Sequence, residues 1–473
     1  MLETLALLGI VGLLALALST AVSTRSRDGY LFDERRHGRI LTAFGIAGSF
    51  IGGGTMLALL DQINRGGLLA AGYLVGALVS LPMLAWVAPR WRSRCAASLP
   101  DAVGQRFGPW LGALTRTIGL LGVLGLLAVQ LGAVAVVVAA CFGADTAIAT
   151  AVVFALVLVT TALGGFRFDA WSDVLQYAVI FLALVILVIL APVTVDARVP
   201  AVATSCLRGA SGWSLGAVLV VPMTIVANPV IFHRVQGSSG SVVARQGAHL
   251  ALLLYALPTA LLIGLALTVP PSDVCLSVAL LTRAGADPAT ALFALGVLAA
   301  TVSSMDSHLL TIGALAPAPA RRHLRPRLLA LAAAGIAFFA WHLVGDLFRV
   351  LAASWLIMLA GLLPSGISLL LSRAPGSRAI SAITLAGLGI AIAGLFAGFG
   401  PEPLAVAVIA CSALVWCVRR SGDGSVEVRG GPLRDPRTGV DSVRSPARLC
   451  RTTGRQRSSF RQEWPAVPPK TPA

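Results

Sequence analysis

Gly48-Ser-Phe-Ile-Gly-Gly-Gly-Thr55 lies inside an apolar run over residues 40–60, and Val226-Ala-Asn-Pro-Val230 lies inside a second run over 213–232. Clustered glycines weaken a helix because glycine loses more backbone freedom on folding than other residues, and an internal proline removes a helical hydrogen bond. Either interruption alone is also explained by tight helix packing or by a simple kink. Their matching positions instead predict two apolar helices that are both broken midway.

The composition identifies the class of protein. Of the 473 residues, 57% are hydrophobic and 12% are charged, and the mean hydropathy is +0.87. This is too much apolar surface for a soluble domain, so we expect an all-α polytopic membrane protein embedded in a lipid bilayer. The formal net charge of +16 would suggest a nucleic-acid partner for a soluble chain. Here the arginines lie in short segments between apolar runs, so no nucleic-acid partner is expected.

Apolar runs long enough to cross about 30 Å of hydrocarbon predict about thirteen transmembrane helices. The first run has no basic residue before it and is followed by arginines, which is typical of a retained signal anchor rather than a cleaved signal peptide. The runs are 3–23, 40–60, 67–88, 110–140, 145–164, 171–194, 213–232, 247–269, 289–315, 326–345, 348–371, 378–399 and 402–418.

The two interrupted runs are five spans apart, so five-span units that begin at residues 40 and 213 would have opposite orientations in the membrane. This 5+5 inverted repeat is the plan of secondary transporters, whose first helices unwind at the midplane. We therefore expect an extra N-terminal helix with a basic cytoplasmic loop, a ten-helix core built from repeats 40–195 and 213–371, two peripheral helices and a disordered basic cytoplasmic tail. Their ranges are 1–39, 40–371, 372–418 and 419–473.

Arginine content differs between alternate loops. One set of loops contains eighteen arginines, among them Arg234, and the opposite set contains five. By the positive-inside rule the first set is cytoplasmic, which places the N-terminus outside and the C-terminus in the cytoplasm of a plasma or bacterial inner membrane. Opposite sides for the two termini require an odd number of spans, and thirteen satisfies this condition.

The seven cysteines have no metal-ligand spacing. Only Cys141, Cys206 and Cys275 can reach the outer side, so a Cys206–Cys275 disulfide is conceivable, but nothing in the sequence supports it.

Two adjacent hydroxyls and a carboxylate lie inside the span 291–315, in Ala299-Ala-Thr-Val-Ser-Ser-Met-Asp-Ser-His308. Polar groups at that depth are costly unless they face a cavity or an ion. Ala300 precedes Ser303 and Ser304 by three and four residues, so one helix face presents a carbonyl and two hydroxyls, which suits a small hard cation. Small serines that merely allow close helix packing are the alternative.

Three further segments complete a family pattern. The first, residues 164–176, reads Gly-Gly-Phe-Arg-Phe-Asp-Ala-Trp-Ser-Asp-Val-Leu-Gln. The second, residues 228–234, reads Asn-Pro-Val-Ile-Phe-His-Arg and is followed by Gly237-Ser-Ser-Gly-Ser241. The third, residues 302–307, reads Val-Ser-Ser-Met-Asp-Ser. With the glycine run 51–54, they resemble the fifth, sixth, eighth and first core helices of the sodium:solute symporters, the family of sodium-coupled sugar, proline, pantothenate and choline transporters. The resemblance covers about residues 1–418, and four motifs in the right helices are more specific than any one of them.

The resemblance implies a LeuT-like fold and a Na⁺ site between the first and eighth core helices. Its five oxygens would be the carbonyls of Gly48, Ile51 and Ala300 and the hydroxyls of Ser303 and Ser304, in agreement with the cation face above. Neutral oxygens suit Na⁺ because a monovalent ion offers too little attraction to offset the desolvation of several carboxylates.

The resemblance also places Asp173 on the route by which sodium leaves. A carboxylate near a helix N-terminus is equally explained by the helix dipole.

The implied function is Na⁺-coupled symport of a small organic solute into the cell by alternating access. The solute would lie at the helix breaks, where Asn228 and free backbone groups of Gly52 and Gly53 would bind it. The choline branch of the family has a tryptophan at the position of Asn228, where a quaternary ammonium needs an aromatic face. A sugar and an amino acid both fit this chain.

Three other functions have less support in the sequence. A proton-coupled symporter is the nearest alternative, because Asp173 could carry H⁺. A transport-inactive solute sensor would usually carry a signalling domain, and the tail after Arg419 is too short and polar to be one. An enzyme is not expected, because no Ser/His, paired-Asp or His-Glu spacing appears inside the predicted bundle.

Overall fold

The computed structural model describes residues 2–21, 26–142, 146–190, 217–270, 275–284, 287–316, 327, 329–332, 335–338, 347–371 and 374–421. These residues are almost entirely helical, and the only β pairing among them is an isolated bridge between His37 and Ser238. Residues 422–473 of the predicted tail, eleven of the twenty residues of the run 326–345, and Cys206 lie outside the described residues.

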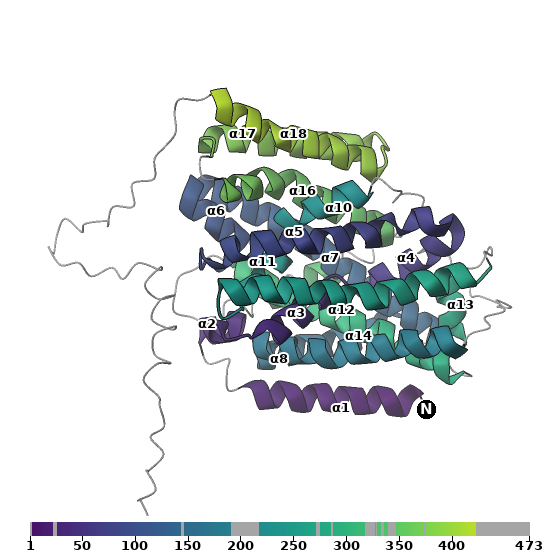
Figure 1. Cartoon of the computed structure of the whole chain (residues 1–473). Helices are drawn as coiled ribbons and strands as arrows, with labels where there is room; N and C mark the ends of the chain where they lie inside the picture. The colour runs from purple at the N-terminus through teal and green to yellow at the C-terminus, as the bar shows by residue number, and fades with distance from the viewer. Residues whose placement is uncertain are drawn as a thin grey trace, which may run out of the picture. The chain divides into compact units, whose positions relative to one another are not determined.

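The helices follow the predicted runs closely (Figure 1). Their bounds are α1 Leu2–Thr20, α2 Arg27–Phe32, α3 Arg39–Gly48, α4 Gly53–Gly66, α5 Gly72–Arg92, α6 Leu99–Phe107, α7 Pro109–Phe142, α8 Thr146–Leu190, α10 Ala217–Val226, α11 Pro229–Gln236, α12 Ser241–Thr268, α13 Leu276–Thr282, α14 Pro288–Leu315, α16 Leu347–Leu370, α17 Ser377–Phe396 and α18 Pro401–Ser421.

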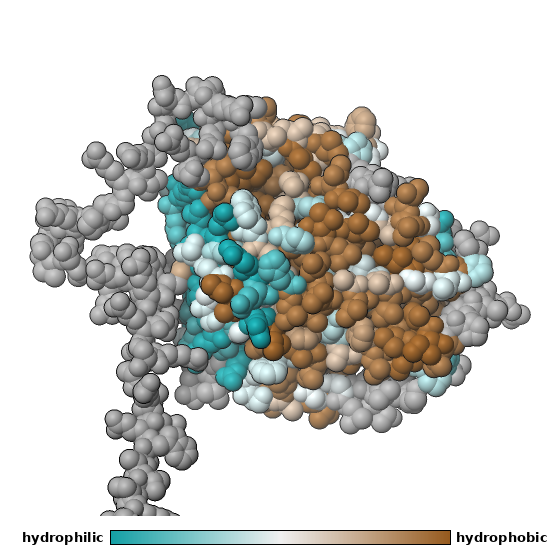
Figure 2. Space-filling model, in the orientation of Figure 1, coloured by the Kyte–Doolittle hydropathy of each residue, from teal (hydrophilic) through white to brown (hydrophobic). Residues whose placement is uncertain are grey.

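An apolar band covers one face of the helices. Figure 2 shows a broad hydrophobic band across the visible face, bordered by hydrophilic residues at the end that holds α2 and α6 in Figure 1. Seven helices are long and apolar enough to cross a bilayer, or eight if the bent pair α10 and α11 forms one span, counting only the described residues. The chain is therefore an integral membrane protein, and the count of thirteen spans stays a prediction.

Both predicted helix breaks are present. Residues 49–52 separate α3 from α4, and Gly52 caps α4 in an extended conformation with φ −96° and ψ 150°. Residues 227–228 separate α10 from α11, and the two helices meet at a bend of 51°. Glycine and proline act locally, so the sequence signal was enough to locate both breaks.

A further break divides α8. A straight helix of 45 residues would be about 68 Å long, more than twice the thickness of the hydrocarbon core. Gly165 interrupts it with φ 57° and ψ −155°. The left-handed φ is one that glycine adopts without steric cost. The break lies between the two spans predicted over 145–164 and 171–194.

The packing places α14 at the centre. It lies along α8 and α7, while α16 packs on α7, and α12 packs on α3 and α5. At one edge α17 and α18 pack on each other and on α16, and at the opposite edge α1 packs on α8 (Figure 1). This arrangement brings the break between α3 and α4 against the serine face of α14.

The two ends of the bundle differ. The first residues of α1 lie at the end that holds α13, and the last residues of α18 lie at the end that holds α2 and α6 (Figure 1). At the α13 end, the Ser277 backbone N–H and hydroxyl donate to the Asp61 carboxylate at 2.8 and 2.7 Å. At the α2 end, backbone hydrogen bonds of His37 with Gly237 and Ser239 join the segment before α3 to the segment after α11.

Gly53 is expected to tolerate no side chain. A Cβ there would overlap Thr301 Oγ1 and would lie 2.8 Å from the Val297 carbonyl oxygen. Gly53→Ala should therefore push α4 away from α14 and destabilise the protein by about 1–3 kcal/mol, the usual cost of overpacking. Thermal unfolding of the purified protein measures this. The control is Gly264→Ala in α12, where nothing lies within 4 Å of a Cβ. Equal unfolding temperatures for the two variants would contradict the close contact at Gly53.

Candidate ion and solute site

The end of α3 meets α14 and α8 at one point. A Cβ on Gly48 would lie 3.1 Å from Ser303 Oγ and 3.3 Å from Asp173 Oδ1. The Ser303 hydroxyl donates to Asp173 Oδ1 at 2.6 Å, and both side chains are buried. Gly48, Ser303 and Asp173, which the sequence analysis assigned to the ion site and its exit, are thus neighbours.

The hydrogen bond from Ser303 to Asp173 fixes where the Ser303 proton points. A hydroxyl has one proton and two lone pairs, so a serine that donates to a carboxylate leaves its lone pairs free to accept or to coordinate. The Ser303 oxygen can therefore present its lone pairs, rather than its proton, to a cation.

The break itself lies against Ser304. A Cβ on Gly52 would lie 3.1 Å from Ser304 Oγ and 2.9 Å from Gln130 Nε2 of α7. The neighbouring Gly53 packs on Thr301 of α14, as described above. Ile51 and Ala300, the remaining predicted ligands, are buried at the same junction. The five predicted ion ligands therefore lie on two segments that are packed against each other.

Asn228 has a structural role that the sequence analysis did not assign. Its Oδ1 accepts hydrogen bonds from the backbone N–H groups of Val230 and Ile231 at 2.8 and 3.3 Å, so it is the N-cap of α11. Asparagine is among the preferred N-cap residues because its oxygen satisfies amide donors that the first turn leaves free. No hydrogen bond of its Nδ2 to another described residue is present.

A buried ion-pair cluster lies on the α2 side of the break. The Arg234 guanidinium of α11 pairs with both oxygens of Asp169, and its Nη2 lies 2.9 Å from Asp173 Oδ2. It also donates to the Ser307 hydroxyl of α14 and, from Nε at 3.3 Å, to the Ser49 hydroxyl at the end of α3. One guanidinium therefore connects α3, α8, α11 and α14.

The structure corrects the arginine count that was used for topology. Arg234 was counted among the cytoplasmic loop arginines, but it lies inside α11 and its side chain is only 2% exposed. Loop position was inferred from charge alone, and a buried arginine with two carboxylate partners does not obey that rule. Without Arg234 the asymmetry is seventeen to five, which keeps the same direction.

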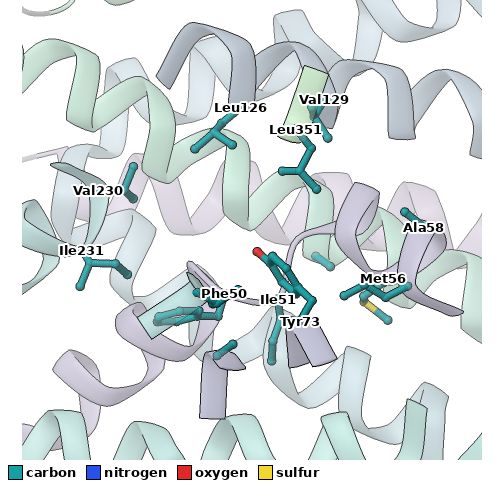
Figure 3. Close-up of a cluster of buried hydrophobic side chains, with 14 of the residues drawn as sticks. Phe50, Ile51, Met56, Ala58, Tyr73, Leu126, Val129, Val230, Ile231 and Leu351 are labelled. Carbon is teal, nitrogen blue, oxygen red and sulfur yellow. The ribbon is translucent and has the colours of Figure 1, made fainter. Parts of the chain in front are cut away.

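Apolar side chains surround the break on its other sides. Figure 3 shows Leu126 and Val129 of α7 and Leu351 of α16 on one side of it, and Phe50, Ile51 and Tyr73 on the other, with Val230 and Ile231 of α11 nearby.

A small pocket begins beside Ile51 and runs between α4, α5, α8 and α12. Because successive residues of an extended segment point in opposite directions, Ile51 faces this pocket while Gly52 faces Gln130 and Ser304. The predicted solute residues Gly52, Gly53 and Asn228 do not line it. The lining residues are Phe50, Ile51, Thr55, Met56, Leu59, Leu74, Leu184, Tyr255, Pro258, Thr259 and Leu262.

Sequence reasoning gave no role to three residues of this region. Asp169 and Arg234 stood inside the quoted motifs, but their pairing joins positions 65 residues apart and could not be read from spacing. Gln130 carried a usable signal, because it is the only amide side chain in the apolar run 110–140. A lone strongly polar group at that depth is a functional candidate by itself.

Comparisons with known proteins agree with this fold. The model of the "Sodium:solute symporter family" matches residues 30–207. A solved Na⁺-coupled sialic acid symporter superposes with a TM-score of 0.71 at 13% identity, covering 88% of this chain and 98% of that chain. A manganese transporter from Eremococcus coleocola superposes with a TM-score of 0.51 at 17% identity, covering 80% of this chain and 95% of that one.

No curated protein sequence matches this chain. At these identities the solved structures show the fold alone. They confirm the predicted all-α, LeuT-like architecture.

Proposed function

We propose that this chain is a sodium:solute symporter, because the family model matches residues 30–207 and the fold is LeuT-like, and that it carries a small organic solute into the cell by Na⁺-coupled symport. The ion site is assigned to the carbonyls of Gly48, Ile51 and Ala300 and the hydroxyls of Ser303 and Ser304. The solute site is assigned to the breaks, at Gly52, Gly53 and Asn228.

The observation that carries this proposal is the position of the two serines. Ser304 lies against Gly52, and Ser303 lies against Gly48 with its proton donated to Asp173. The end of a broken helix leaves carbonyl oxygens without helical partners, and such carbonyls are the usual complement to side-chain oxygens around Na⁺ in transporters of this plan.

The charge of the neighbouring cluster supports a cation at this point. Asp169 and Asp173 share one guanidinium, that of Arg234. Two carboxylates and one guanidinium leave a formal charge of −1, and in a medium of low dielectric such a charge attracts a cation strongly. Asp173 acts on the ion through Ser303 rather than by direct ligation, and it lies on the α2 side of the site, where the sodium exit route was predicted.

Coupling follows from the shared break. An ion bound to Gly48, Ile51 and α14 fixes the relative positions of α3, α4 and α14, and the solute residues Gly52 and Gly53 belong to the same segment. Na⁺ should therefore raise solute affinity, and solute should raise Na⁺ affinity by the same factor. Alternating access then requires α3 and α11 to separate from α8 and α14 on the α2 side.

Proton coupling through Asp173 is the second candidate. Asp173 is bonded to both Ser303 and Arg234, so a proton-carrying Asp173 would have to break both contacts in every cycle. Na⁺ binding to the serines needs no such step. The structure therefore favours the sodium proposal.

Orientation in a plasma or bacterial inner membrane is part of the proposal. The arginine asymmetry predicts an external N-terminus and a cytoplasmic C-terminus, and the opposite placement of α1 and α18 termini supports it (Figure 1). A reporter that works only in the cytoplasm should be active when it is fused after Arg420. A reporter that works only outside the cytoplasm should be active when it is fused before Met1. Finding both reporters on one side would contradict the odd span count.

Uptake into proteoliposomes tests the function. Purified protein should accumulate at least one solute of a labelled panel under an inward Na⁺ gradient, and much less under an equal K⁺ gradient. Asn228→Ala should weaken solute affinity at every Na⁺ concentration, because it removes a solute contact and the α11 cap. Accumulation driven equally well by H⁺ without Na⁺ would favour the proton alternative.

A further inference from the structure

Gln130 is a buried amide with unused hydrogen-bonding capacity. It lies on α7 and is 4% exposed, and its Oε1 has no hydrogen-bond partner among the residues that the structure describes. A buried carbonyl oxygen without a partner is costly, because it has left water and gained nothing in exchange. Such a group in a membrane protein is explained when a ligand supplies the missing partner.

The position of Gln130 points to the solute. Its Nε2 and Ser304 Oγ both lie about 3 Å from the point where a Gly52 side chain would begin. Gly52 therefore has no room for a side chain, and the Gln130 amide stands beside the exposed backbone of the break. The amide thus borders both the proposed ion site and the proposed solute site.

The segments that form the two breaks and the facing part of α7 contain no charged side chain. No Asp, Glu, Lys, Arg or His occurs between Arg39 and Asp61, between Arg116 and Phe142, or in residues 217–228. These are the segments that form the two breaks and the facing part of α7. Asp173 lies beside Gly48 at the edge of the break, and with Arg234 and Asp169 it forms the cluster of formal charge −1 described above. A bound Na⁺ would offset that charge, so a charged solute would find no unpaired counter-charge in this cluster and would carry much of the cost of its desolvation.

We propose that Gln130 determines the specificity of the solute site, and that this site takes an uncharged solute that bears hydroxyl or amide groups. The assignment rests on the proposed transport function and deepens it. Gln130 Oε1 is an acceptor in need of a donor, while Asn228 Nδ2 is a donor, since Asn228 Oδ1 is used by the α11 cap. A hydroxyl or an amide can donate to the first and accept from the second. A carboxylate cannot donate, and an ammonium group cannot accept.

The test uses four hexose derivatives of similar size and different charge. D-glucose and N-acetyl-D-glucosamine are neutral, D-gluconate is an anion and D-glucosamine is largely a cation near neutral pH. In proteoliposomes with an inward Na⁺ gradient, at least one neutral member should be accumulated in preference to both charged ones. Gln130→Leu should weaken its apparent affinity about 5- to 150-fold, the range for a lost partner of a buried polar group. Gln130→Glu should shift the preference toward D-glucosamine.

A matched control is available in α4. Gln62 is also buried, and neither of its amide atoms has a hydrogen-bond partner in the described part of the chain. It lies ten residues beyond Gly52, about 15 Å along the helix. Gln62→Leu should leave the solute preference unchanged. Binding of ²²Na⁺ to solute-free protein should be retained in Gln130→Leu.

The outcomes separate this inference from the transport proposal. Preference for D-gluconate or D-glucosamine, or accumulation of neither neutral sugar by a protein that binds ²²Na⁺, overturns the assignment of an uncharged solute and leaves the ion site intact. Equal solute affinity in the wild type and Gln130→Leu overturns the role of Gln130. Absence of saturable ²²Na⁺ binding to the wild-type protein would instead refute the proposal of Na⁺-coupled transport.

Discussion

Arg234→Met is expected to destabilise the protein by about 3–5 kcal/mol, the usual cost of removing one partner of a buried ion pair. Methionine fills much of the volume but leaves Asp169 and Asp173 buried without their guanidinium, and both carboxylates are fully buried. Membrane and soluble domains alike have small net stabilities, and for soluble domains the total is about 5–15 kcal/mol. The expected result is a much lower yield of folded protein and a lower thermal unfolding midpoint in detergent.

A second substitution tests the cause. Arg234→Met combined with Asp169→Asn restores the formal charge of the cluster to −1, so it should recover part of the lost stability. Arg234→Lys should fall between the wild type and Arg234→Met, because an ammonium cannot pair with both oxygens of Asp169 at once. The control is Arg245→Met, since Arg245 is exposed on α12 and surface changes usually alter stability by less than about 0.5 kcal/mol. An unchanged unfolding midpoint in Arg234→Met would show that the cluster does not depend on its guanidinium.

Ser304→Ala and Ser303→Ala are each expected to weaken apparent Na⁺ affinity about 5- to 150-fold. Each removes one oxygen from a desolvated shell, and an unsatisfied group of this kind costs about 1–3 kcal/mol. Because ion and solute binding are linked, saturating Na⁺ should largely restore solute affinity in Ser304→Ala. Asn228→Ala should show no such rescue. The measurement is the Na⁺ concentration at half-maximal solute uptake.

Two variants make this prediction specific. Ser304→Thr keeps the hydroxyl and should be milder than Ser304→Ala. Ser368→Ala removes a buried hydroxyl of α16 that donates to the Pro364 carbonyl at 2.7 Å, away from the break, and should leave Na⁺ dependence unchanged. If both alanine variants at 303 and 304 fold, insert and keep wild-type Na⁺ dependence, the serines are packing residues.

The sequence was informative where structure is decided locally. The breaks at 49–52 and 227–228 follow from glycine and proline, which act on their own helix. The shared face of Ala300, Ser303 and Ser304 follows from the helical period, and α14 is a continuous helix over these residues.

Long-range pairing was beyond what one sequence could predict. Arg234 was read as a loop residue because charge near the end of an apolar run usually marks a loop, whereas its partners on α8 are 61 and 65 residues away. The capping role of Asn228 was missed for a different reason. The residue was weighed only as a solute ligand, although asparagine directly before proline is a common helix start.

Direct ²²Na⁺ binding to purified, solute-free protein tests the central claim most directly, because it needs no knowledge of the solute. The account predicts saturable binding to the wild type, with affinity reduced about 5- to 150-fold in Ser304→Ala and unchanged in Ser368→Ala. Wild-type affinity in the Ser303→Ala/Ser304→Ala double variant, or no saturable Na⁺ binding to the wild type, would contradict the assignment of the ion site to the break between α3 and α4 and the serine face of α14.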